Sequence, residues 1–130
     1  MSECVELETR QSLIEHLKST SYEYTIMKFT ASWCGPCQKV QPELDKILDE
    51  MNTKFSNSPN KFEFFHVDVD DNFDLFAFLK SKKMVKGIPT IFLYKKTSYT
   101  ANEPEHIYVP QSSISGTNVE NIRALFSLVV

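Results

Sequence analysis

Apolar and polar positions are arranged along the chain in blocks that predict a mixed α/β fold. Three runs rich in β-branched and aromatic residues are typical of strands buried in a sheet, and they span residues 24–30, 62–69 and 90–94. A weaker strand is expected near His106–Val109, with a continuation toward Ile114, where it would form a hairpin with 90–94. Residues 5–7 could add a short edge strand.

Between these runs, apolar residues recur at helical spacing and predict four helices. The stripes are Leu13, Ile14 and Leu17; Val40, Leu44, Ile47 and Met51; Phe73, Phe76 and Leu79; and Val119, Ile122, Phe126 and Val129. The second helix should run from Cys34 to about Met51 or Phe55, with a kink at Pro42. Asp71 should cap the third helix. Thr117 and Glu120 have the spacing of a capping box for the last helix.

This order of elements predicts one domain over residues 1–130, built on a mixed sheet of four to five strands with helices on both faces. At 130 residues and 42% hydrophobic side chains, the chain is large enough for one buried core. A net charge of −3, from 14 basic and 17 acidic residues, argues against nucleic acid as a partner. Without a secretory leader or a membrane-length apolar run, we expect a cytoplasmic protein, or an organellar one that has lost a transit peptide.

The most informative motif is Trp33-Cys34-Gly35-Pro36-Cys37, which directly follows the predicted strand 24–30. Cysteines three residues apart at a helix start lie on one face, close enough to form and open a disulfide. Gly35 keeps the approach to Cys34 open, and Pro36 suits a first turn, where its missing N–H has no helical partner. The helix N-terminus favours the Cys34 thiolate. A structural or zinc-binding pair is the alternative, but two further ligands are not evident.

With these motifs in order, the chain resembles the thioredoxin family over nearly its whole length. The residues that carry the resemblance are Phe29, Ala31, the motif 33–37, Pro42, 67–71, 87–90 and Gly116. The resemblance implies a thioredoxin fold and a protein-disulfide reductase in which Cys34 attacks a target disulfide and Cys37 resolves the mixed disulfide. It also implies no bound cofactor, electrons from NADPH through a thioredoxin reductase, and disulfide-containing proteins as targets. We expect a monomer.

The resemblance further makes Pro89 a cis proline that lies against the two sulfurs. Trp33, Ile88, Pro89 and Gly116 would then form a shallow groove around Cys34, where the backbone of Ile88 pairs with an extended substrate. A second hypothesis, from a different class, is a binding module that holds a partner in this groove with little or no redox turnover.

One residue departs from the family pattern. Where the family usually buries an aspartate beneath the second cysteine, this chain has Lys28. A buried lysine must pair, reach solvent or titrate low. We hypothesise that Lys28 lies near the thiols, lowers the pKa of Cys37 and stabilises the dithiol form, with Glu63 as a possible counter-ion. His66 is interpreted as a packed or surface imidazole, and no cluster has the spacing of a metal site.

Two polar segments, 53–61 and 95–110, are longer than the family pattern requires. We predict surface loops for both, with partner selection by the second segment as the alternative. Cys4, the third cysteine, is predicted to be an innocuous free thiol, with an intermolecular disulfide as the alternative.

Overall fold

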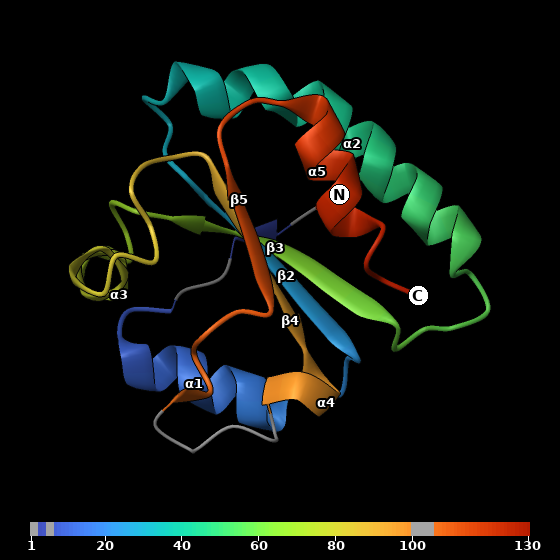
Figure 1. Ribbon diagram of the computed structural model, residues 1–130, viewed down its shortest axis with the longest axis horizontal. Coiled ribbons are helices and arrows are strands. Elements are labelled where there is room, and N and C mark those ends of the chain that lie inside the picture. Colours follow the sequence, from blue (N-terminus) through green and yellow to red (C-terminus); the bar gives the residue numbers. More distant parts are fainter. Residues whose placement is uncertain (1–2, 5–6, 100–105) are drawn as a thin grey trace.

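The computed structural model describes residues 3–4, 7–99 and 106–130. In these residues strands and helices alternate, as the sequence predicts (Figure 1). The elements are β1 (Glu3–Cys4), α1 (Arg10–Ser19), β2 (Tyr24–Thr30), α2 (Gly35–Lys54), β3 (Phe62–Asp68), α3 (Phe73–Ser81), β4 (Thr90–Lys95), α4 (Lys96–Tyr99), β5 (Ser112–Ser115) and α5 (Val119–Phe126). Leu7, from the expected edge strand at 5–7, is not in a strand, and residues 5 and 6 lie outside the described residues. A short edge strand, β1, lies at Glu3–Cys4.

The strands form one mixed sheet in the order β1-β3-β2-β4-β5. β3 runs parallel to β1 and to β2, whereas β4 is antiparallel to both β2 and β5. The predicted mixed sheet with helices on both faces is confirmed. β2 lies at the centre, which places the cysteine motif that follows it at the end of the most enclosed strand.

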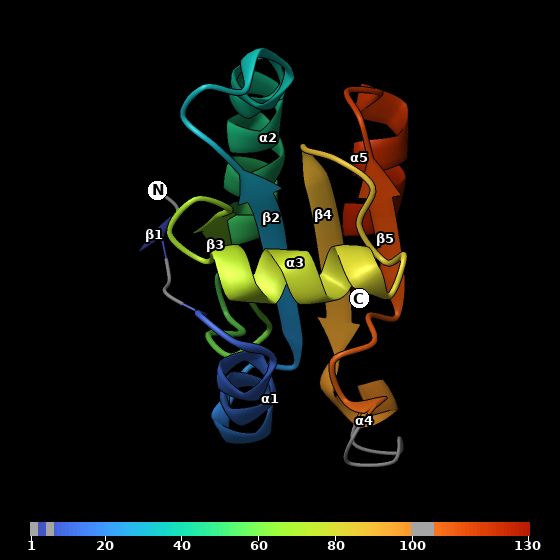
Figure 2. The same ribbon diagram turned by 90° about the vertical axis from the view of Figure 1, so that its left-hand side faces the viewer.

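Side chains of β2 alternate between the two faces of the sheet, and each face has its own core. Met27 and Phe29 pack with residues of α1 and α3, whereas Ile26 packs with residues of α2 and α5. Figure 2 shows α3 crossing one face of the sheet. Since Lys28 is two residues after Ile26, this alternation directs its side chain toward α2 rather than toward α1.

α2 is the longest helix of the described residues and begins at the cysteine motif. Its apolar stripe is buried as predicted, and it ends at Lys54, within the expected range. Pro42 lies inside the helix, which continues through it, while the kink itself stays a prediction. Residues 56–60, in the first predicted insertion, are exposed, as a surface loop should be.

Two predicted helix caps are wrong by one residue. α3 is preceded by Asn72, not Asp71, and the buried Asn72 side chain makes no cap hydrogen bond. Its Oδ1 instead accepts the N–H of Leu7 at 2.6 Å, which ties the N-terminal segment to the β3–α3 turn. α5 is capped by Asn118, whose Oδ1 accepts the N–H of Asn121 at 3.0 Å, so Thr117 and Glu120 form no capping box.

The predicted strand at 106–109 is also wrong, because its apolar residues serve the core. Ile107 and Tyr108 are buried, and the Tyr94 hydroxyl donates to the carbonyl of Tyr108 at 2.7 Å. The hairpin partner of β4 is instead β5, which contains the predicted continuation to Ile114. The expected polar loop after β4 begins with the short helix α4, and residues 100–105 lie outside the described residues.

Candidate functional site

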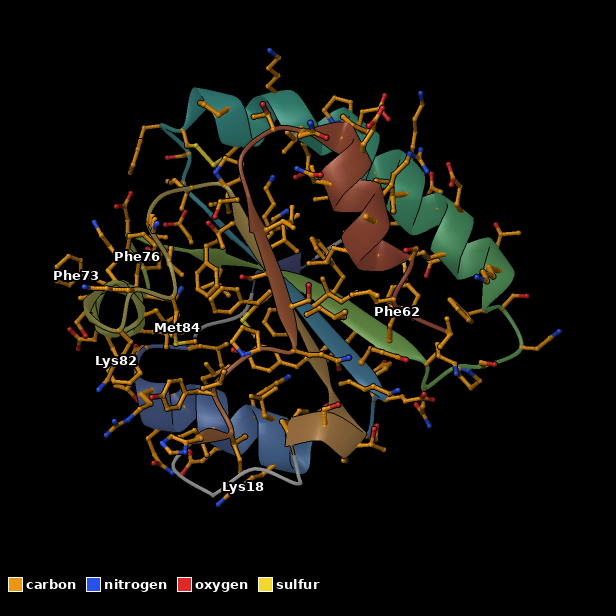
Figure 3. All side chains as sticks on the ribbon, in the orientation of Figure 1. Lys18, Phe62, Phe73, Phe76, Lys82 and Met84 are labelled. Atoms are coloured by element: carbon orange, nitrogen blue, oxygen red, sulfur yellow. A yellow bond between two sulfur atoms is a disulfide. The ribbon has the colours of Figure 1, made fainter. Side chains whose placement is uncertain are left out.

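The cysteine pair lies at the start of α2 and is closed as a disulfide. The Cα atoms of Cys34 and Cys37 are 5.3 Å apart, within the usual range for a disulfide. Figure 3 shows the sulfur–sulfur bond at the N-terminal end of this helix. Cys34 is the N-cap residue, and its Sγ accepts the backbone N–H of Cys37 at 3.2 Å. The helix N-terminus therefore already directs a donor at this sulfur, which favours a thiolate there after reduction.

The two residues between the cysteines have different roles in this turn. Pro36 occupies the first turn of α2, where the missing N–H removes no helical hydrogen bond. A Cβ added at Gly35 would have no atom within 4 Å, so space alone does not require a glycine. Cys37 is fully buried and Cys34 is only 4% exposed. Cys34, whose approach the sequence predicts to be open, is therefore largely covered in the oxidised protein.

A cis peptide bond between Ile88 and Pro89 borders the disulfide, as the resemblance implies. The carbonyl oxygen of Ile88 lies 3.8 Å from the Sγ of Cys34. The carbonyl of Pro89 accepts the N–H of Gly116 at 3.0 Å, and Gly116 has a φ of 98°, which favours glycine. The structure thus brings the segment that leads into β4 and the residue that follows β5 together beside Cys34.

Trp33 stands at the rim of the site, 66% exposed. Its indole Nε1 donates to Oδ2 of Asp70 at 2.8 Å, and the N–H of Asp70 donates to Oδ1 of Asp68 at 2.8 Å. Asp70 thereby fixes the indole, a role that sequence reasoning missed. Because this contact joins residues 37 positions apart, no local pattern could have indicated it.

Lys28 lies beside Cys37, near the two cysteines as the sequence hypothesis placed it. The residue is 1% exposed, and its Nζ donates to the carbonyl oxygen of Cys37 at 3.0 Å and to Oε1 of Gln41 at 2.7 Å. Burial lowers the pKa of Lys28 to about 8, and the charge of Asp45 opposes this shift.

Glu63 is not the counter-ion of this lysine. Its carboxylate accepts from the hydroxyls of Thr20 and Thr25, at 2.7 and 2.8 Å, and pairs with Nε2 of His16 at 3.0 Å. The reason is the alternation along β3: Glu63 pairs in register with Thr25, while Lys28 pairs with the even-numbered His66. The hypothesis therefore placed Glu63 on the wrong face of the sheet.

Gln41 connects Lys28 to two further polar side chains that sequence reasoning did not assign to the site. Its Oε1 lies 3.1 Å from Nε2 of His66, and its Nε2 donates to Oδ1 of Asp45 at 2.8 Å. The oxygen can only accept, so His66 donates through Nε2. Burial, followed by the charge of Lys28, lowers the pKa of His66 to about 4, which leaves it neutral at pH 7.

A sequence signal for this network exists. Cys37, Gln41 and Asp45 follow one another at intervals of four residues, and such residues are neighbours on one face of a helix. That face of α2 covers the β2 side chain of Lys28.

Among the described residues, no group of three or more His, Cys, Asp or Glu side chains could hold a metal ion. None of the described helices has the length and apolar character that a membrane crossing requires.

Comparisons with known proteins agree with this geometry. The thioredoxin family model matches residues 5–110. Thioredoxin of Ovis aries is 28% identical over 125 residues, covering 96% of this chain and 97% of that protein. Thioredoxin of Mus musculus is 33% identical over 90 residues, covering 69% and 74%. The solved structure of reduced Schistosoma mansoni thioredoxin preprotein superposes with a TM-score of 0.64 at 19% identity, covering 99% of this chain and 100% of that one.

Proposed function

Because the chain belongs to the thioredoxin family and is a thiol–disulfide oxidoreductase that acts on disulfide-containing proteins, we propose that Cys34 is its nucleophile and Cys37 its resolving thiol. The observation that supports this assignment is the Cys34–Cys37 disulfide at the N-terminus of α2, beside the cis Ile88–Pro89 bond. Cys34 receives the backbone donor, whereas Cys37 is fully buried behind it.

The chemistry proceeds in two exchange steps. The Cys34 thiolate attacks one sulfur of the target disulfide, forms a mixed disulfide and expels the other target sulfur as a thiolate. The Cys37 thiolate then attacks Cys34 Sγ and releases the second target sulfur. Two electrons pass from the dithiol to the target, and the product on this chain is the disulfide seen in the structure.

The target is held in a groove formed by Trp33, Ile88, Pro89 and Gly116. The position of Ile88, whose carbonyl oxygen lies 3.8 Å from the Sγ of Cys34, supports this assignment, because backbone groups beside the sulfur can pair with an extended segment of the target. Gly116 contributes to the shape of the groove and donates no backbone hydrogen bond to the target, since its N–H already donates to the carbonyl of Pro89. Trp33, held by Asp70, provides an exposed aromatic wall.

Each turnover leaves a disulfide that needs two electrons from another protein. Following the family, we propose that a thioredoxin reductase supplies them from NADPH, and that the protein acts as a monomer in the cytoplasm. The family resemblance and the composition of the chain support these three assignments.

A coupled assay tests the proposal. With NADPH, a thioredoxin reductase and insulin, the protein should sustain NADPH oxidation in proportion to the insulin disulfides reduced. Leaving out the reductase should stop the reaction, and dithiothreitol should restore insulin reduction. A chain that binds insulin but turns over with neither reductant would instead be the binding module, and the redox proposal would be wrong.

A further inference from the structure

The network beneath Cys37 contains a buried cation, the ammonium group of Lys28. Lys28 Nζ is held by two neutral oxygens, the carbonyl of Cys37 and the amide oxygen of Gln41. Burying an ammonium in such a place costs free energy unless the charge is paired with an anion. The proposed chemistry creates one there: the thiolate of Cys37, a residue that is itself fully buried.

We propose that Lys28 is a positioning residue for the resolving step, whose ammonium charge favours the Cys37 thiolate while Gln41 and Asp45 hold the lysine against that residue. This inference rests on the proposed roles of the two cysteines. Burial alone disfavours a thiolate, so Cys37 needs a compensating charge. Lys28 can provide it, because its Nζ already donates to the backbone carbonyl of the same residue at 3.0 Å.

The groups packed around Lys28 leave it as the charge that matters most to Cys37. α2 contributes Cys37 and, through Gln41, the carboxylate of Asp45. β3 contributes His66, which is neutral at pH 7, and the β4 residue in register with Lys28 is the uncharged Ile91. Asp45 is exposed, so solvent weakens its effect on the buried thiol.

Proton and electron transfers balance in this step. The thiol proton of Cys37 passes to the Lys28 amine when the lysine is neutral, or to solvent when it is already charged. Either route leaves an ammonium beside a thiolate, and the two groups titrate as a pair. The thiolate electron pair forms the bond to Cys34 Sγ, the bond from Cys34 to the target breaks, and the departing target thiolate takes a proton from solvent.

The test uses the reduced protein carrying Cys4→Ser, so that no third thiol reacts, as the parent for all variants. The aromatic disulfide DTNB then releases one thionitrobenzoate when Cys34 attacks and a second when Cys37 resolves. Lys28→Met should slow the second release about tenfold at pH 7, since an adjacent charge shifts thiol ionisation by about one pH unit or more. It should also move the pH profile of that phase upward. The first release should change less than about twofold.

Lys39→Met is the matched control, because it removes the same charge from an exposed position on α2. It should leave both phases unchanged. If Lys28→Met leaves the rate and pH profile of the second phase as in the parent, the role of Lys28 is wrong while the cysteine assignment stands. If the parent releases only one thionitrobenzoate, the proposed roles of the cysteines fail first.

A measurement on the unchanged protein covers the case in which Lys28→Met does not fold. The titration of Lys28, followed by NMR at its Nζ, should give a higher pKa in the reduced protein than in the oxidised one, because only the reduced protein offers a thiolate. Equal pKa values in both states would overturn the inference.

Discussion

Cys34→Ser is expected to lower the rate of insulin reduction by about three orders of magnitude or more, as removal of an essential nucleophile does in other enzymes. A hydroxyl is not ionised at neutral pH and cannot form a mixed disulfide, so the helix N-terminus at residue 34 has no reactive anion to stabilise. The measurement is the initial rate of NADPH oxidation in the coupled assay.

Cys4→Ser is the control for this result. Cys4 lies in β1, at the edge of the sheet opposite β5, whereas the site lies where β2 meets α2. The rate with Cys4→Ser should equal that of the parent. Comparable losses in both variants would mean that the chemistry does not depend specifically on the pair at the start of α2.

Phe29→Ala is expected to lower the free energy of unfolding by about 3–5 kcal/mol, the usual cost of removing a buried phenyl ring. Phe29 is fully buried in β2, its ring centroid 5.0 Å from that of Phe92 and 6.3 Å from that of Phe76. The cavity would lie in the face of the sheet covered by α1 and α3. Urea unfolding of the oxidised protein measures the change.

Phe73→Ala is the control, because it removes the same side-chain atoms from an exposed position and so isolates the effect of burial on stability. Phe73 is 68% exposed at the start of α3, and Figure 3 shows it pointing away from the sheet. Phe73→Ala should change the free energy of unfolding by no more than about 0.5 kcal/mol. Equal losses for the two variants would contradict the core described for this face.

The local patterns that predicted the fold are those in which neighbouring residues determine the outcome. The apolar run 24–30 forms β2, and the stripe after Cys34 forms α2. In each case the spacing of the apolar residues lets only one type of element, a strand or a helix, bury them together. The caps and the second half of the hairpin could not be predicted in this way. Ile107 and Tyr108 look like strand residues but fill the core, which depends on the tertiary surroundings of Tyr94.

The candidate site divides along the same line. Cys34 and Cys37 were predictable because they belong to a short motif, and the cis bond before Pro89 was expected because the resemblance to the family implies it. The surroundings of Lys28 were only partly so: its place beneath Cys37 was predicted, but Glu63 was chosen without regard to the alternation of β3. Side chains that meet across elements, such as Trp33 and Asp70, leave no trace in local spacing.

The alkylation rate of Cys34 tests the central claim most directly, which is that the start of α2 holds this sulfur as a reactive thiolate. The reduced protein would be treated with iodoacetamide at pH 7 and the modified cysteine identified by mass spectrometry. Cys34 should react about five- to tenfold faster than free cysteine, because a larger fraction is ionised. A rate no faster than that of free cysteine would contradict the account.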